Sequence, residues 1–255
     1  MPPSRNANER QQAMTDCVIM PVYNEAGTLP GVLARIRDFH QGPLIAVDDG
    51  STDGSGQILA RFGGLSIIQR QRNMGYGQAL IDGFALAAAR GYHRAVTIDC
   101  DEQHEPSLIP RMFEKIGDFD ILSGSRYLEE SDNHDPAPED RGRINRVITE
   151  KLNLITGYNL TDSFCGFKCY KVEALKRLSL DEPGYAMPLQ FWAQAFRLGL
   201  TVSEIAVPRI YKNLGRTFGG GIDDPQARLK YYMDVLEREL AKWPISSSSA
   251  PTRTT

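Results

Sequence analysis

Two carboxylates two residues apart, Asp99 and Asp101, are the residues of this sequence best suited to chemistry. They follow a short apolar run, Ala95–Ile98, and Gln103 stands two positions further on. At the end of a strand, residues i and i+2 point to the same side, so the spacing predicts oxygen ligands gathered in one region. Oxygen ligands suit Mg²⁺ or Mn²⁺, and Mg²⁺ is commonly held by one or two carboxylates plus substrate phosphates. The alternative is an acidic turn before a helix that begins near Pro106, because acidic residues also favour helix N-termini.

Short apolar runs alternate with amphipathic segments along most of the chain, and this alternation indicates the elements that position the carboxylates. The expected strands are Cys17–Val22, Leu44–Val47, Leu65–Ile68, Ala95–Ile98, Asp120–Ser123 and Val202–Val207. The expected helices are Thr28–His40, Thr52–Phe62, Gln78–Arg90, Pro106–Ile116, Arg141–Ile155, Pro188–Leu198 and Arg228–Leu240. Strands separated by helices of this length predict βαβ units, and hence an α/β, Rossmann-like domain with a mainly parallel central sheet flanked by helices.

Polar, turn-rich clusters stand at the predicted carboxyl ends of three strands. They are Pro21–Glu25, Asp48–Gly54 and Asp99–Asp101. In an open α/β sheet, ligands bind beyond the carboxyl ends of the strands. Three such clusters on one edge indicate a binding site more strongly than any one of them alone.

The composition excludes several classes of protein. A net charge of −3 and a pI near 5.9 argue against a nucleic-acid binder that works through net charge. The N-terminus has no apolar core typical of a secretory signal, and no window approaches the ~18 apolar residues of a membrane helix. Four scattered cysteines without zinc spacing predict free thiols. We therefore expect a cytoplasmic protein with no transmembrane segment, and the composition indicates no oligomeric state.

Common nucleotide and hydrolase fingerprints are missing. The sequence has neither the Rossmann Gly-x-Gly-x-x-Gly nor the Walker Gly-x-x-x-x-Gly-Lys, and Asn73–Gly77 is too short for either although it is glycine-rich and opens a helix. It also lacks a Gly-x-Ser-x-Gly elbow, and its four histidines form no obvious triad.

The ordered motifs resemble those of family 2 glycosyltransferases, in particular polyprenyl-phosphate sugar transferases such as the dolichyl-phosphate mannosyl- and glucosyltransferases. The motifs are Pro21–Glu25, Val47–Asp53, Asp99–Pro106, Gly124–Tyr127 and Thr161–Lys168. The resemblance spans about residues 17–240 and implies a GT-A fold. We expect one GT-A domain over residues 16–243, with disordered tails at 1–15 and 244–255.

The resemblance implies a role in donor binding for each matching position. The residues expected to contact the nucleotide sugar are Pro21, Tyr23, Glu25, Asp49, Asp99 and Cys100. Asp101 and Gln103 would hold the Mg²⁺ or Mn²⁺ ion that bridges the diphosphate. The metal is needed because the leaving nucleoside diphosphate gains negative charge as the glycosidic bond breaks.

The acceptor side is expected to contain arginines. Arg126 would bind a phosphate acceptor, with Arg141 or Arg143 as a second clamp, since the planar guanidinium binds phosphate bidentately. A phosphate acceptor is already an anion and needs no strong general base. Asp162, a further candidate catalytic residue, could position the acceptor or sugar, act as a base toward a hydroxyl acceptor, or only cap a turn before a strand.

Several segments keep two interpretations. Lys212 and Arg216, in a glycine-rich flap over 211–221, could close over the diphosphate, although this flap departs from the family pattern. Residues 129–140 are acidic, contain prolines and show no periodicity, so we expect a mobile loop that is either a lid over the site or a plain solvated loop. The helices Arg141–Ile155 and Arg228–Leu240 could lie on anionic lipid as a peripheral membrane contact, or could simply pack in the core. Trp192 stands where relatives often carry an acidic residue, so it bears on sugar or acceptor identity.

Together these observations predict a metal-dependent inverting hexosyltransferase. It would move mannose or glucose from GDP-mannose or UDP-glucose to a polyprenyl phosphate. One alternative retains the donor and uses a soluble saccharide, small-molecule or protein acceptor. A second is a catalytically silent subunit that binds a nucleotide sugar.

Overall fold

Seven strands form one twisted sheet in the order β3-β2-β1-β4-β6-β5-β7 in the computed structural model, which describes residues 16–128, 135–211 and 217–242. The strands are β1 (Asp16–Val22), β2 (Leu44–Asp48), β3 (Leu65–Gln69), β4 (Arg94–Thr97), β5 (Ile121–Ser125), β6 (Lys168–Lys171) and β7 (Val202–Ala206). Strands β1 to β4 pair in parallel, as do β5 and β7, whereas β6 is antiparallel to both of its neighbours. The predicted α/β class and mainly parallel sheet are confirmed.

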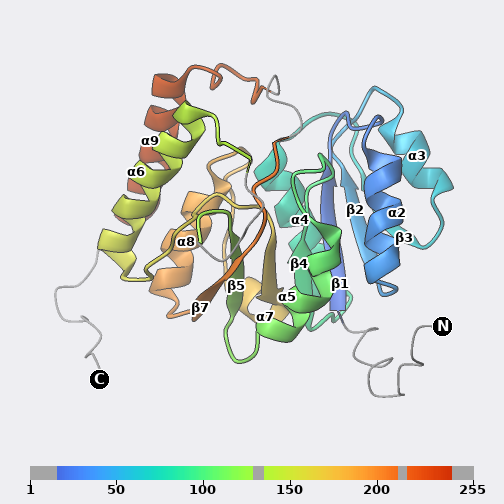
Figure 1. Cartoon of the computed structure of the whole chain (residues 1–255), viewed down its shortest axis with the longest axis horizontal. Coiled ribbons are helices and arrows are strands. Elements are labelled where there is room, and N and C mark those ends of the chain that lie inside the picture. The colour runs from blue at the N-terminus through green and yellow to red at the C-terminus, as the bar shows by residue number, and fades with distance from the viewer. Residues whose placement is uncertain (1–15, 129–134, 212–216, 243–255) are drawn as a thin grey trace.

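Helices cover both faces of the sheet (Figure 1). One face packs against α2 (Leu29–Phe39), α3 (Ser55–Arg61) and α5 (Ile109–Lys115), the last preceded by a short 3₁₀ turn at Pro106–Leu108. The other face packs against α4 (Tyr76–Ala89), α6 (Glu139–Thr156), α7 (Val172–Leu175), α8 (Met187–Arg197) and α9 (Pro225–Lys242). All seven residues of β1 are buried, because alternate side chains serve the two faces: Val18 and Met20 belong to the first core, Cys17 and Ile19 to the second.

Strand β6 is not among the strands predicted by residue range, although a strand after the turn at Asp162 was one of the alternatives, and it determines which segment reaches the carboxyl ends of the parallel strands. It inserts between β4 and β5 and runs antiparallel, so it begins at the edge where its neighbours end. The preceding segment, residues 161–167, is therefore brought to the carboxyl ends of the parallel strands. The short helix α7 that follows was also not predicted.

The amphipathic helices α6 and α9 bury their apolar faces. Ile144, Ile148 and Leu152 of α6 join the same core as Val235 and Leu236 of α9. Core packing, the alternative to lipid contact, explains the periodicity of these buried residues, whereas Val147 and Leu154 of α6 are exposed. A peripheral membrane contact stays a prediction. None of the helices in the described residues is long and apolar enough to cross a membrane.

The helix predicted from Arg141 begins two residues earlier, at Glu139, so part of the predicted loop 129–140 is helical. Acidic Glu139 and Asp140 occupy its first turn, where they complement the helix dipole. Residues 135–138 lie beside the segment after β7, since the Asp135 N–H donates to the Arg209 carbonyl at 2.8 Å. Positions 129–134 of that loop, like both predicted tails, lie outside the described residues.

Two helical glycines offer a test of how closely α4 lies on the sheet. A methyl group at Gly83 would stand 2.4 Å from the Cγ2 atom of Ile19, whereas one at Gly31 of α2 would meet nothing within 4 Å. We expect Gly83→Ala to lower the free energy of unfolding by about 1–3 kcal/mol through overpacking. Gly31→Ala should instead raise it by up to about 1 kcal/mol through helix propensity. Urea unfolding of both variants checks this, and equal stabilisation by both would contradict the packing.

Candidate active site

A cleft of about 1250 Å³ opens at the carboxyl ends of the parallel strands and brings together most of the predicted site residues. Those that line it are Pro21, Tyr23, Glu25, Asp49, Asp99, Cys100, Asp101, Gln103, Arg126 and Arg141. Arg143 is exposed on α6 and does not line the cleft, and Asp162 is fully buried behind Arg126. Lys212 and Arg216 lie outside the described residues.

The two carboxylates Asp99 and Asp101 lie in a turn after β4, which ends at Thr97. The expectation that they share one side of a strand is therefore wrong. The turn is held by the Asp101 carboxylate, which accepts the backbone N–H of Gln103 at 3.1 Å, and Glu102 adopts φ +62°. Both carboxylates still line the cleft, because the turn folds back over the edge of the sheet.

The loops after β1 and β2 brace each other along one wall of the cleft. The Asn24 N–H donates to Ser51 Oγ at 3.0 Å, and the Thr52 N–H donates to the Asn24 side chain at 2.8 Å. Next to them, the Glu25 N–H donates to Ser55 Oγ at 2.9 Å. These bonds fix Tyr23, whose side chain is exposed at the cleft.

Asp49 connects this wall to the glycine-rich segment before α4. Its two carboxylate oxygens accept the backbone N–H groups of Met74 and Gly75 at 2.9 and 2.8 Å. Burial raises the pKa of Asp49, although these bonds and Arg70 act in the opposite direction. Asp49 therefore shapes the cleft by holding the segment over 73–75.

His104 holds the backbone of Asp99 in place through a hydrogen bond. Its Nδ1 atom accepts the Asp99 backbone N–H at 3.0 Å, and its ring stacks on Phe167 with centroids 5.4 Å apart. The imidazole is therefore neutral, with its proton on Nε2, which lies 3.8 Å from Asp99 Oδ2. Burial lowers the pKa of His104 to about 4.

The depressed pKa of His104 predicts a pH dependence of stability. The unfolded chain has the ordinary histidine pKa of about 6.5, so it takes up a proton before the folded chain does. The contribution of neutral His104 to the free energy of unfolding is fully present above about pH 6.5. It is lost as the pH falls toward 4, by on the order of 3 kcal/mol. Chemical denaturation at several pH values should show this loss in the parent protein and a flatter profile in His104→Asn. Parallel profiles in the two proteins would contradict it.

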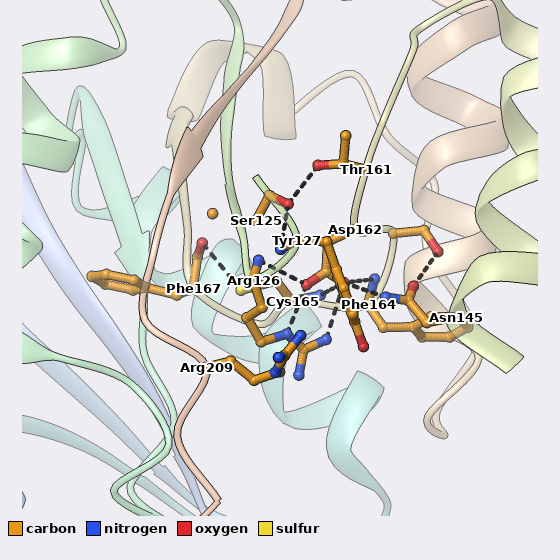
Figure 2. Close-up of polar contacts among 12 residues, drawn as sticks. Ser125, Arg126, Tyr127, Asn145, Thr161, Asp162, Phe164, Cys165, Phe167 and Arg209 are labelled. Carbon is orange, nitrogen blue, oxygen red and sulfur yellow. Dashed lines mark hydrogen bonds and ion pairs between the residues drawn. The ribbon is translucent and has the colours of Figure 1, made fainter. Parts of the chain in front are cut away.

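The acceptor-side arginine, Arg126, is held by a buried carboxylate (Figure 2). Asp162 Oδ2 accepts Arg126 Nε at 2.7 Å and Asp162 Oδ1 accepts Arg126 Nη2 at 3.0 Å. Asp162 also accepts the backbone N–H groups of Phe164 and Cys165, each at 3.1 Å. Burial raises the pKa of Asp162, but the charge and hydrogen bonds of Arg126, together with the charge of Lys168, bring this pKa below its ordinary value. This carboxylate is an ionised anchor for Arg126, and its geometry does not suit a base that receives a proton.

Helix α6 joins this ion pair through a residue that sequence reasoning missed. Asn145 donates to Asp162 Oδ1 at 3.1 Å and lines the cleft one helical turn after Arg141. The i,i+4 spacing from Arg141 was the available signal for it. Thr149 bonds both Asn145 Oδ1, at 3.1 Å, and Ser163 Oγ, at 2.8 Å. The buried polar chain fixes Arg126 relative to α6.

Aromatic residues from the C-terminal part also line the cleft and were not predicted. Phe218 lies between two guanidinium groups, with its ring centroid 4.8 Å from Arg141 Cζ and 4.5 Å from Arg228 Cζ. Tyr185 contacts Phe218 edge-on at 5.3 Å and stacks on Tyr76 at 5.5 Å. Tyr76 stands in the glycine-rich run that opens a helix and Phe218 in the predicted flap 211–221, whereas Tyr185 had no sequence signal.

Trp192, the position that departs from the family pattern, does not reach the cleft. The side chain is fully buried, and its indole N–H donates to the Ser163 carbonyl at 2.9 Å. Any effect of this departure on the identity of sugar or acceptor would therefore be indirect, and that link stays a prediction.

The donor set of the cleft suits a cation that a substrate helps to hold. Asp101 and Gln103 supply carboxylate and amide oxygens, which are hard ligands. Within the described residues, no group of three or more histidine, cysteine or acidic side chains is arranged to hold a metal. A site of this kind fits Mg²⁺ or Mn²⁺ completed by phosphate oxygens and water.

Curated relatives are similar over most of the chain. An undecaprenyl-phosphate mannosyltransferase of Micrococcus luteus is 30% identical over 213 residues, 80% of this chain and 87% of the relative. A polyprenol monophosphomannose synthase of Mycolicibacterium smegmatis is 28% identical over 225 residues, 84% of each chain.

A solved structure shares the fold of this chain, and a family profile matches its sequence. Glucosyl-3-phosphoglycerate synthase from Mycobacterium tuberculosis, in complex with Mn²⁺, UDP and glucosyl-3-phosphoglycerate, has a TM-score of 0.69 and 22% identity, with 97% of this chain and 88% of that chain covered. This similarity confirms the GT-A fold. The profile described as "Glycosyl transferase family 2" matches residues 17–179, more than half of the chain. The chain therefore belongs to glycosyl transferase family 2, the family that its motifs resemble.

Proposed function

We propose that this glycosyltransferase moves a hexose, mannose or glucose, from a nucleoside-diphosphate sugar to a polyprenyl phosphate. The observation that carries the proposal is one cleft lined both by the acidic turn Asp99–Gln103 and by Arg126 and Arg141. The first set suits a sugar nucleotide with its metal, and the second suits an anionic acceptor. The relatives named as undecaprenyl-phosphate mannosyltransferase and polyprenol monophosphomannose synthase support the same acceptor class.

The sugar nucleotide would lie along the wall of the cleft formed by the loops after β1 and β2. Pro21, Tyr23 and Glu25 would surround the base and ribose, and Asp49 would shape the floor through the segment it holds. Asp99, with Cys100 beside it, would accept hydroxyl hydrogen bonds from ribose or sugar. Carboxylates suit this task because a charged acceptor strengthens each such bond.

Asp101 and Gln103 would hold Mg²⁺ or Mn²⁺ against the diphosphate. A divalent cation there supplies charge stabilisation for the departing nucleoside diphosphate. The neighbouring synthase was solved with Mn²⁺ and UDP, which agrees with this choice of ion.

Arg126 would bind the acceptor phosphate, with Arg141 as the second clamp. Asp162 holds the Arg126 guanidinium by two side-chain bonds and is itself buried, so the arginine is oriented before the acceptor arrives. An acceptor that enters as an anion requires no base. The geometry of Asp162 therefore favours a positioning role over the alternative role as a base toward a hydroxyl acceptor.

Apolar side chains extend the cleft next to these arginines and favour a lipid acceptor. The residues are Ile144, Phe164, Pro188, Phe218, Ile222 and Tyr232. Phe164 follows Asp162 closely and packs on Tyr232 at 4.8 Å, while Phe218 contacts Arg141. Ile144 and Tyr232 are already buried in the protein core, whereas the other four keep accessible surface. An isoprenoid segment attached to the bound phosphate would bury part of that surface, at about 25 cal/mol per Å². A short, polar phosphate acceptor would leave these residues unused.

An acceptor panel tests the proposal. Purified protein with Mn²⁺ or Mg²⁺ is assayed with GDP-mannose and UDP-glucose against polyprenyl phosphate, 3-phosphoglycerate and free saccharides. Transfer to the prenyl phosphate, dependent on metal, is the expected result. Transfer to a soluble acceptor alone would overturn the lipid assignment, and nucleotide binding without transfer would favour the silent subunit.

A further inference from the structure

We propose that Tyr76 is a positioning residue for donor binding: its hydroxyl group fixes the carboxylate of Asp99 in the orientation that receives the sugar nucleotide. The inference deepens the proposed function and rests on it. Tyr76 is the first residue of α4 and lines the same cleft as Asp99.

The contact itself is direct. Tyr76 Oη donates to Asp99 Oδ1 at 3.0 Å. Burial and the adjacent Asp99 raise the pKa of Tyr76 well above its ordinary value, so the phenol keeps its proton and remains a donor. A hydrogen bond to a charged carboxylate is stronger than one between neutral groups. The bond therefore restricts Asp99 more than an ordinary tyrosine contact would.

The phenol ring is itself fixed. It stacks on Tyr185 with centroids 5.5 Å apart and planes 12° apart. The first turn of α4 is bound to the loop that carries Tyr185, because the Gln78 N–H donates to the Pro183 carbonyl at 3.0 Å. Glu182 anchors that loop by accepting the Tyr231 hydroxyl at 2.5 Å. A donor on a rigid ring can orient Asp99 without losing rotamer freedom when substrate binds.

Asp99 is held at three further points around this bond. Its backbone N–H is bound by His104 Nδ1, and His104 Nε2 lies 3.8 Å from its other carboxylate oxygen. Gly166 closes the remaining side: a methyl group there would lie 2.7 Å from Tyr76 Oη and 2.8 Å from Asp99 Oδ2. Any side chain at position 166 would therefore displace the Tyr76–Asp99 pair. Asp99 is thus preorganised by residues from α4, the β4 turn and the segment before β6.

Removing the hydroxyl oxygen of Tyr76 should weaken the binding of the sugar nucleotide. Tyr76→Phe keeps the ring and its stack on Tyr185, and removes only the bond to Asp99. We expect the affinity for the sugar nucleotide to fall roughly 10- to 100-fold, the range of a hydrogen bond to a charged group. Because the acceptor arginines are untouched, the KM for the acceptor should not change.

A double-mutant cycle separates positioning from a structural role. Calorimetry with UDP and GDP, each with Mn²⁺, and donor kinetics are measured for Tyr76→Phe, Asp99→Asn and the double variant. If Tyr76 acts through Asp99, Tyr76→Phe has little further effect in the Asp99→Asn background. The matched control is Tyr158→Phe, which loses a partly buried 2.9 Å hydrogen bond to the Leu200 carbonyl outside the cleft and should leave nucleotide affinity unchanged.

The outcomes are distinguishable. Full affinity in Tyr76→Phe, or losses that multiply in the double variant, would overturn the positioning role while leaving the proposed function intact. Loss of affinity in Tyr158→Phe equal to that in Tyr76→Phe would assign the effect to folding and would also overturn it. Absence of nucleotide binding in the parent protein would overturn the proposed function and this inference with it.

Discussion

Asp101→Ala is expected to lower sugar transfer by about 10²–10³-fold, because the variant loses the carboxylate proposed to hold the cation beside the departing diphosphate. Asp101 lines the cleft and also closes its own turn through the 3.1 Å bond from the Gln103 N–H. Asp101→Asn keeps an oxygen for that bond and removes the charge, so it isolates the effect on the cation. Both variants should bind UDP or GDP equally with and without Mn²⁺, whereas the parent protein should bind more tightly with the ion.

Glu102→Gln is the matched control for this prediction. Glu102 is an acidic residue of the same turn that does not line the cleft, and glutamine keeps its size. We expect near-parental transfer and unchanged dependence of nucleotide binding on Mn²⁺. Full transfer by Asp101→Asn, or equal losses in Glu102→Gln and Asp101→Asn, would contradict the assignment of the cation to Asp101.

Strands β1 and β2 could be predicted because their continuous apolar runs are typical of strands buried on both faces. The runs at Cys17–Val22 and Leu44–Val47 correspond to β1 and β2 with at most one residue added at an end. Strand β6 could not be recognised in the same way, because it has four residues and begins and ends with lysine. Lys168 is nevertheless buried, since its ammonium group donates to the Cys165 carbonyl and lies 5.6 Å from the centre of the Trp192 ring. A buried lysine satisfied by tertiary contacts has no local sequence signal.

The residues proposed to bind the sugar nucleotide were easier to predict from the sequence than the buried residues that hold Arg126. Asp49 and Asp101 stand in motifs directly after strands, so the sheet alone places them at one edge. The partners of Asp162 come from β5, α6 and the segment before β6, and only the antiparallel insertion of β6 brings those together. The role of Asp162 as the anchor of Arg126 therefore depended on the antiparallel placement of a strand whose range was not predicted.

Removing the charge of Asp162 is expected to have the largest effect on stability. Asp162→Asn leaves the Arg126 guanidinium unpaired in a site where the Asp162 side chain is fully buried and that of Arg126 is 17% exposed. Breaking a buried ion pair from one side costs about 3–5 kcal/mol of unfolding free energy. Urea unfolding measures this loss. In the fraction that remains folded, the KM for the acceptor should rise while nucleotide affinity stays unchanged, because Arg126 loses its orientation and the donor wall does not.

A control pair and a double variant distinguish the roles of charge and position. Asp16→Asn removes the partner of Arg94 at the opposite edge of the sheet, where the ion pair is more exposed, so it should cost less stability and leave both substrates unaffected. The double variant Asp162→Asn/Arg126→Gln removes both charges and should regain part of the stability but none of the transfer. Recovery of transfer in the double variant would contradict the role of Arg126 in acceptor binding. Parental stability in Asp162→Asn would show that its contacts with Asn145 and the backbone N–H groups suffice without the charge.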